Sequence, residues 1–216
     1  MLFHNAPLFA AARSAKRNGT TAERGLDGFA PWFASEFGVR VVFVTRDEIQ
    51  AGGDETRTRL IVIVETDEDR DRLCDRFRSV RPGVARACLA RLAKVCPGVP
   101  VKAAFLVIDS FADECLVQAC SKFLDHDATV IANEYRDRVW RIDGFARTLA
   151  VFFRTESDRT QSEVDGTTAA IRQRCFTAVC RYDEFDYLTE DDLRLRFESK
   201  ETLDRKYDGK LFYYWK

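Results

Sequence analysis

The feature that most constrains the fold of this chain is an internal repeat at an offset of 89 positions. Residues 66–70 (TDEDR) match residues 155–159 (TESDR), and Asp109-Ser110 matches Glu198-Ser199. The two matched segments are well separated in the sequence, each at a predicted junction between a strand and a helix, and both have the same offset without a gap. We interpret the match as an internal duplication.

Apolar positions between the junctions follow the same offset. The pairs are Leu60 with Leu149, Val62 with Val151, Leu106 with Leu195, and Ile108 with Phe197. They fall in runs typical of strands, so we expect all eight side chains to point into the core.

Hydrophobic periodicity predicts the elements of the first half. A helix is expected over residues 22–37, and Gly38 would end it. Strands are expected at 38–45 and 60–65, joined by a long polar loop over 46–57. A helix from Asp67, broken at Pro82 and resumed over 84–95, is followed by a strand at 101–108 and a helix at 112–124. This order is ββαβα.

The second half repeats that order. Strands are expected at 138–142, 149–154 and 193–198, with helices over 161–180 and 201–206. The aromatic ending 211–215 (LFYYW) follows a turn at Asp208-Gly209 and is expected to be a final strand of the sheet. The predicted fold is α+β.

The repeat also predicts a domain organisation. Two ββαβα units, at about 38–126 and 127–216, would pair about a pseudo-twofold axis through one shared sheet or two apposed sheets. We therefore expect one compact domain over residues 22–216. Residues 1–21 contain three basic residues and no acid, and we expect a loose N-terminal arm. An amphipathic transit peptide is the alternative.

The matched polar residues stand where strand becomes helix. Thr66, Thr155, Ser110 and Ser199 can cap the free amides of the helix that follows. The alternative is that the strand ends around Asp109 and Glu198 line an acidic cleft, as in a small enzyme. Capping is the simpler interpretation.

Charge and composition exclude several classes. The 216 residues carry 34 basic and 35 acidic side chains, so the net charge of −1 does not favour nucleic acid as a partner. No apolar run is long enough to span a bilayer, so no membrane partner is expected. Length and composition also exclude a small disulfide scaffold.

The seven cysteines contain no C-x-x-C pair and lie mostly among apolar residues, as expected of buried, reduced thiols in the cytoplasm. His4 and His126 are the only histidines and have no metal-binding context, so we expect no zinc and no cofactor. A cysteine nucleophile would need His126 as its base, but two aspartates flank this residue and favour a polar helix end. Phosphate-binding loops and common catalytic motifs are absent from the sequence.

The strongest candidate for a binding site is the acidic segment, residues 183–192. Aromatic residues are interleaved with six acids in this segment, and the spacing is not that of an EF-hand. The segment could bind a divalent cation, bind a basic partner, or simply be a solvated loop anchored by Phe185 and Leu188. The candidate partner-binding residues are Asp183, Glu184, Asp186, Tyr187, Glu190, Asp191 and Asp192.

The last 20 residues, from Phe197 to Lys216, together with residues 182–185 (YDEF), resemble the close of a group of uncharacterised bacterial proteins of similar size. The resemblance implies a bacterial cytoplasmic origin and assigns no catalytic residue. The first half departs from this ending, because Cys115 stands where the second half has Asp204.

These observations together favour a non-enzymatic module that binds another protein, either neutralising a toxin or regulating a partner. The alternative is a small enzyme with its acidic cleft at Asp109 and Glu198.

Overall fold

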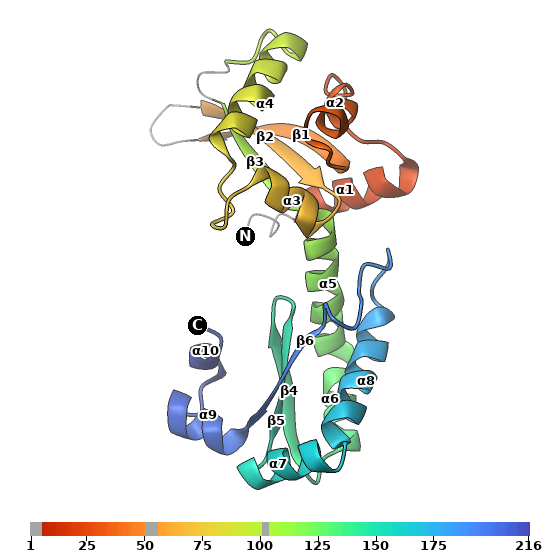
Figure 1. Cartoon of the computed structure of the whole chain (residues 1–216), viewed down its shortest axis with the longest axis vertical. Coiled ribbons are helices and arrows are strands. Elements are labelled where there is room, and N and C mark those ends of the chain that lie inside the picture. The colour runs from red at the N-terminus through yellow and green to blue at the C-terminus, as the bar shows by residue number, and fades with distance from the viewer. Residues whose placement is uncertain (1–5, 51–55, 101–103) are drawn as a thin grey trace. The chain divides into compact units, whose positions relative to one another are not determined.

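A computed structural model describes residues 6–50, 56–100 and 104–216. The chain is α+β, with helices and two separate three-stranded sheets (Figure 1). It divides into two compact units, residues 1–114 and 115–216. Predictions that concern 1–5, 51–55 and 101–103, including His4 and the start of the strand expected at 101, lie outside the described residues. The single domain over 22–216 stays a prediction, and each unit is described by itself.

The first unit holds one sheet of order β1-β2-β3, in which β2 runs antiparallel to β1 and parallel to β3. Its elements are α1 (Ala6–Asn18), α2 (Phe29–Phe37), β1 (Val41–Gln50), β2 (Thr56–Val64), α3 (Asp67–Leu73), α4 (Pro82–Val95) and β3 (Phe105–Ser110). Helix α5 (Phe111–His126) begins in this unit and continues into the second.

The core of the first unit forms around β2. Residues 60–64 are each at most 4% exposed, because alternate side chains of a central strand enter opposite faces of the sheet. Leu60, Val62 and Val64 pack with side chains from α2 and α4. Helix α1 packs against β1, and its buried Ala12 lies outside that cluster. Helix α1 therefore covers the other face.

The second unit holds a sheet of order β4-β5-β6 with the same directions. Its elements are α6 (Ala128–Glu134), β4 (Val139–Phe145), β5 (Thr148–Phe153), α7 (Glu156–Val164), α8 (Thr167–Cys180), β6 (Arg194–Ser199), α9 (Lys200–Tyr207) and α10 (Leu211–Tyr214).

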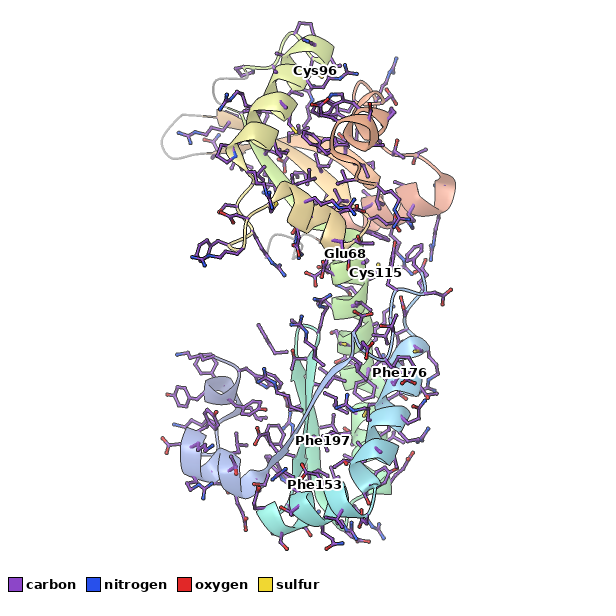
Figure 2. All side chains as sticks on the ribbon, in the orientation of Figure 1. Glu68, Cys96, Cys115, Phe153, Phe176 and Phe197 are labelled. Carbon is purple, nitrogen blue, oxygen red and sulfur yellow. The ribbon has the colours of Figure 1, made fainter. Side chains whose placement is uncertain are left out.

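Both faces of the second sheet are covered. On one face Val151 and Phe153 pack with residues from α5, α6 and α8, and the rings of Phe153 and Phe197 lie 6.2 Å apart (Figure 2). On the other face Ala150 and Phe152 pack with Leu203 of α9 and with aromatic residues of the C-terminal segment. Helix α9 and the C-terminal segment thus form a second layer on the sheet, opposite the layer of α5, α6 and α8.

The sequence repeat coincides with the strand registers of the two sheets. Every β2–β3 pair, from Arg59↔Phe105 to Val64↔Ser110, recurs 89 positions later between β5 and β6. The first strands correspond at an offset of 98, and both carry an irregularity at the equivalent place, between Val41 and Phe43 and between Val139 and Arg141. The two halves therefore differ by nine residues in their hairpins and agree in topology.

The predicted inward residues are buried in the structure. Seven of them are at most 9% exposed, namely Leu60, Val62, Leu106, Ile108, Leu149, Val151 and Leu195. Phe197 is partly buried and packs against the same core. The prediction of the core positions is thus confirmed.

Three predictions for the first half are wrong in detail. Residues 6–18 of the expected loose arm form α1, because Ala12 and Ala15 are buried against the unit. The helix expected from residue 22 starts only at Phe29. Within the long loop expected over 46–57, residues 46–50 belong to β1 and 56–57 to β2, and Arg59 Nε donates to Asp47 Oδ1 across the hairpin at 2.9 Å. Residues 51–55 lie outside the described part of the chain.

Two predictions for the second half are also wrong. The helix expected over 161–180 is divided into α7 and α8 at Gly166, whose φ of +80° interrupts the helix. The aromatic ending is the short helix α10 and its flanking residues, not a strand of the sheet. Tyr214 and Trp215 are partly buried against the face of the sheet, so their burial does not require strand pairing. Of the two arrangements expected for the sheets, one shared sheet or two apposed sheets, the structure excludes the first, because each half has a sheet of its own.

Removing the ring of Phe152, which lies beneath α9 and the C-terminal segment, should destabilise the chain far more than removing the ring of Phe212 on α10. Phe152 is fully buried, whereas Phe212 on α10 is 68% exposed. We expect Phe152→Ala to lower the free energy of unfolding by about 3–5 kcal/mol and Phe212→Ala by less than about 0.5 kcal/mol. Urea denaturation of both variants measures the difference, and equal losses would contradict this packing.

Candidate functional site

All four predicted helix caps are formed. The hydroxyl oxygens of Thr66 and Thr155 accept from the amides of Asp69 and Asp158 at 3.3 and 3.0 Å. Ser110 and Ser199 accept from Asp113 and Thr202 at 3.1 and 3.0 Å. In α7 the Asp158 carboxylate also accepts from the Thr155 amide, which completes a capping box. The matched hydroxyls therefore have a structural role.

A buried arginine lies beside the caps of the first unit. The Arg70 side chain is 6% exposed, and its guanidinium nitrogens lie 3.1 Å from Asp67 Oδ1, 3.1 Å from Asp71 Oδ1 and 3.6 Å from Asp113 Oδ2. Burial lowers the pKa of this guanidinium, but the carboxylates of Asp67, Asp71 and Asp113 outweigh it and the pKa is raised. Arg70 thus joins the starts of α3 and α5.

The second unit has an arginine at the matching position. Arg159 Nη2 lies 2.6 Å from Glu156 Oε1, and Nη1 lies 2.5 Å from Glu163 Oε1. Glu156 and Arg159 correspond to Asp67 and Arg70 at the repeat offset. The Arg159 side chain is 24% exposed, so this version of the pair is partly solvated. Both halves hold an arginine and a carboxylate at the same strand end.

Asp109 and Glu198, the predicted cleft residues, occupy equivalent positions in β3 and β6. Both are partly buried, opposite Ile63 and Phe152 respectively. Burial raises the pKa of Asp109, while Arg78 and Arg70 partly offset the rise. Glu198 contributes to raising the pKa of Arg159. Each carboxylate therefore lies near the arginine of its own unit, and a cleft joining the two stays a prediction.

Part of the acidic segment fixes the loop between α8 and β6. Asp183 is 8% exposed, and its Oδ2 accepts from the Leu188 amide at 2.6 Å. Leu188 itself packs against the core of the unit. Asp192 Oδ2 accepts from the amide and hydroxyl of Thr189 at 3.1 and 2.6 Å. Asp183 and Asp192 are thus structural residues of this loop.

The other acids of the segment face solvent. Glu184, Asp186, Glu190 and Asp191 are exposed, and Asp186 has a φ of +56°, which aspartate tolerates better than most residues. Between them the partly buried rings of Phe185 and Tyr187 lie 6.2 Å apart at an interplanar angle of 39°. The predicted surface therefore consists of four exposed carboxylates around an aromatic pair.

Burial weakens the acidity of three of the seven thiols. None of the cysteines forms a disulfide, and burial raises the pKa of Cys88 and Cys175 to about 12 and that of Cys120 to about 11. Such thiols are poor nucleophiles at neutral pH. His126 is exposed and lies by the Tyr182 ring at 6.2 Å. The described residues contain no group of three metal-binding side chains.

Sequence reasoning missed one cavity. A hollow of about 570 Å³ lies between β4 and the helices α5 and α6, and Asp125, Thr129, Asn133, Arg141 and Asp143 provide its polar wall. Thr129 and Asn133 are four residues apart in α6 and share one face of this helix, a signal present in the sequence, whereas Asp125 lies in the last turn of α5. Helix α6 was not predicted, so this face was not recognised.

No protein-family model, curated protein or solved structure is found to match this chain. Within 6–50, 56–100 and 104–216, none of the helices has the length and apolar character needed to cross a membrane.

The two equivalent arginines should differ in their effect on stability. Arg70→Met removes a buried cation from between the partly buried carboxylates of Asp67 and Asp113, so we expect a loss of about 2–3 kcal/mol in the free energy of unfolding. Arg159→Met removes a partly solvated pair and should cost about 1 kcal/mol or less. Urea denaturation of the two variants tests this, and a similar loss in both would contradict the burial of Arg70.

Asp109 should make stability depend on pH. A raised pKa means that the folded chain holds this proton more tightly than the unfolded chain, so stability falls as pH rises above the ordinary aspartate value of about 3.9. Asp109→Asn removes this dependence. We expect the melting temperature of the variant, measured relative to that of the wild type, to increase as pH rises and to decrease again in acid. The control is exposed Asp137→Asn, and a pH-independent effect of Asp109→Asn would contradict the burial argument.

Proposed function

We propose that this protein is a non-enzymatic module that binds another protein through the acidic segment, residues 183–192. The observation that carries the proposal is an anchored loop with exposed carboxylates around the Phe185–Tyr187 pair. Because Asp183 and Asp192 hold the loop from within, the exposed groups need little further ordering when a partner binds.

The chemistry of the segment favours a partner with a basic surface. Exposed carboxylates accelerate association with a positively charged partner and select against acidic ones. Aromatic side chains next to them supply apolar contact area of the kind that dominates binding energy at interfaces. The partner would be a basic protein, such as a toxin that this module neutralises or a factor that it regulates.

We also propose that the two halves arose by duplication of a ββαβα unit. The common strand registers and the equivalent strand irregularities support this origin. The acidic segment has no counterpart in the first half, because residues 94–103 (KVCPGVPVKA) contain no acid. The binding surface would therefore be an acquisition of the second half.

A bacterial cytoplasm is the proposed location. Seven free cysteines, five of them buried, suit a reducing compartment. The resemblance of the chain end to bacterial proteins agrees with this proposal.

A small enzyme is the second candidate, and the raised pKa of Asp109 favours it. A partly buried carboxyl group that keeps its proton to higher pH can act as a general acid. Glu198 would be its counterpart in the second unit.

Neutralising the exposed part of the acidic segment should abolish binding without unfolding the chain. The fourfold variant Glu184→Gln, Asp186→Asn, Glu190→Gln, Asp191→Asn keeps the two structural aspartates. We expect it to lose the basic protein that the wild type recovers by affinity purification from the native host, as identified by mass spectrometry. Binding by the wild type should weaken at high salt.

The matched control removes the same charge from exposed acids elsewhere: Glu36→Gln, Glu68→Gln, Asp137→Asn and Asp208→Asn. This control should retain the partner. If the wild type recovers no partner, or if the fourfold segment variant retains every one, the acidic segment is an ordinary solvated loop and the enzyme candidate takes precedence.

A further inference from the structure

The cavity beside β4 is a groove between the edge of a sheet and a helical wall. Strand β4 is the first strand in the order β4-β5-β6, so within the described part of the chain one of its edges has no neighbouring strand. The consecutive residues 140–144 line the hollow of about 570 Å³ from this side. Leu124, Asp125 and residues of α6 line it from the other. Helix α6 packs against β4 and gives the groove its second wall.

The register of the hairpin determines which backbone groups enter the groove. Phe145 and Thr148 flank a two-residue turn and pair with each other, and backbone bonding alternates along an antiparallel pair. The N–H and C=O groups of Ile142 and Gly144 are therefore directed away from β5. The Gly144 amide donates to Asp143 Oδ1 at 2.9 Å, as expected of an amide that does not bond to β5.

Gly144 keeps the groove narrow at one end. A Cβ at this position would lie 2.8 Å from Leu149 Cδ2 and 3.0 Å from Leu124 Cδ1, so α5 and the hairpin approach each other too closely for any side chain. Ile142, one step away from this end along the edge, offers a free N–H and C=O. These are the groups to which an added strand bonds.

The polar wall gives the groove a charge preference. Asp125 is exposed and has no ion-pair partner among the described residues, whereas Asp143 is paired with Arg141 at 2.7 Å and also accepts from Trp215 Nε1 at 3.2 Å. The one uncompensated charge lining the groove is thus negative. Thr129 and Asn133 follow at four-residue spacing and offer hydrogen-bonding groups along the same wall.

We propose that this groove binds an extended peptide segment of another protein, which adds as a strand to the free edge of β4 and places a lysine or arginine against Asp125. The five residues 140–144 span four intervals of about 3.3 Å, so this edge has the length of about four residues of an added strand. Backbone bonds to Ile142 supply affinity, and Asp125 selects the basic side chain. This site is separate from the acidic segment and does not depend on the function proposed for that segment.

The first experiment uses a phage-displayed library of random peptides, selected on the purified full-length chain. We expect enrichment of peptides that combine an extended, alternating pattern with a basic residue. An enriched peptide is then synthesised in two forms, N-methylated at one or the other set of alternate residues. Only the set that faces β4 donates to the protein, so one form should bind at least about tenfold more weakly and the other nearly as well as the parent.

The second experiment measures the same peptide against two protein variants. Asp125→Asn should weaken binding about two- to fivefold, because an exposed ion pair is lost. Asp208→Asn, an equal charge change at an exposed residue outside the groove, should have no effect. The proposal is overturned if selection yields no peptide that binds the purified chain, if the two N-methylated forms bind alike, or if Asp125→Asn binds as tightly as the wild type.

Discussion

The central strand of each sheet is buried on both faces, and the rest of the fold depends on this burial. None of the residues 60–64 in β2 or 149–153 in β5 is more than 4% exposed. A strand of this kind must have a helical layer on each side, since an uncovered face would leave several large apolar side chains in water. In the first unit the second layer comes from α1, which precedes the ββαβα order. In the second unit it comes from α9, the last helix of that order, together with the C-terminal segment.

This requirement explains which elements could be predicted. The runs LIVIV and LAVFF are continuously apolar, and the core positions, the ββαβα order of elements along the chain and the helix caps followed from them and from the repeat. The same continuity indicates burial on both faces, but α1 and the C-terminal segment, which help to cover the second faces, lie outside the ββαβα order. Local pattern therefore predicts an arm for residues 6–18 and a strand for residues 211–215, whereas both segments are helical in the structure. Both segments are apolar enough to pack, but the local sequence pattern does not identify the face of the sheet against which each one packs.

The candidate surfaces were predictable to different degrees. The composition of the acidic segment was visible in the sequence, yet the division between the structural pair Asp183 and Asp192 and the exposed acids required the loop geometry. The burial of Arg70 could not be predicted from the sequence, because the residues around it match those around the partly solvated Arg159. The groove depends on which strand is at the edge of the sheet and on α6, and both follow from tertiary structure.

The buried central strands also affect how the chain reaches its fold. Strand β2 can pair with β1 through a local hairpin, but it can pair with β3 only after a segment 46 residues further along the chain has joined the sheet. The separation between paired residues of β5 and β6 is the same. Parallel pairing over such a distance is slow, and an apolar strand with one open edge can pair with another chain in the meantime. The charges that flank the apolar run 60–64 of β2, at Arg57, Arg59 and Glu65, oppose such pairing. In β5 the apolar run is preceded by Arg147 and followed by Arg154, so both nascent strands are bounded by charges that keep partly folded chains apart.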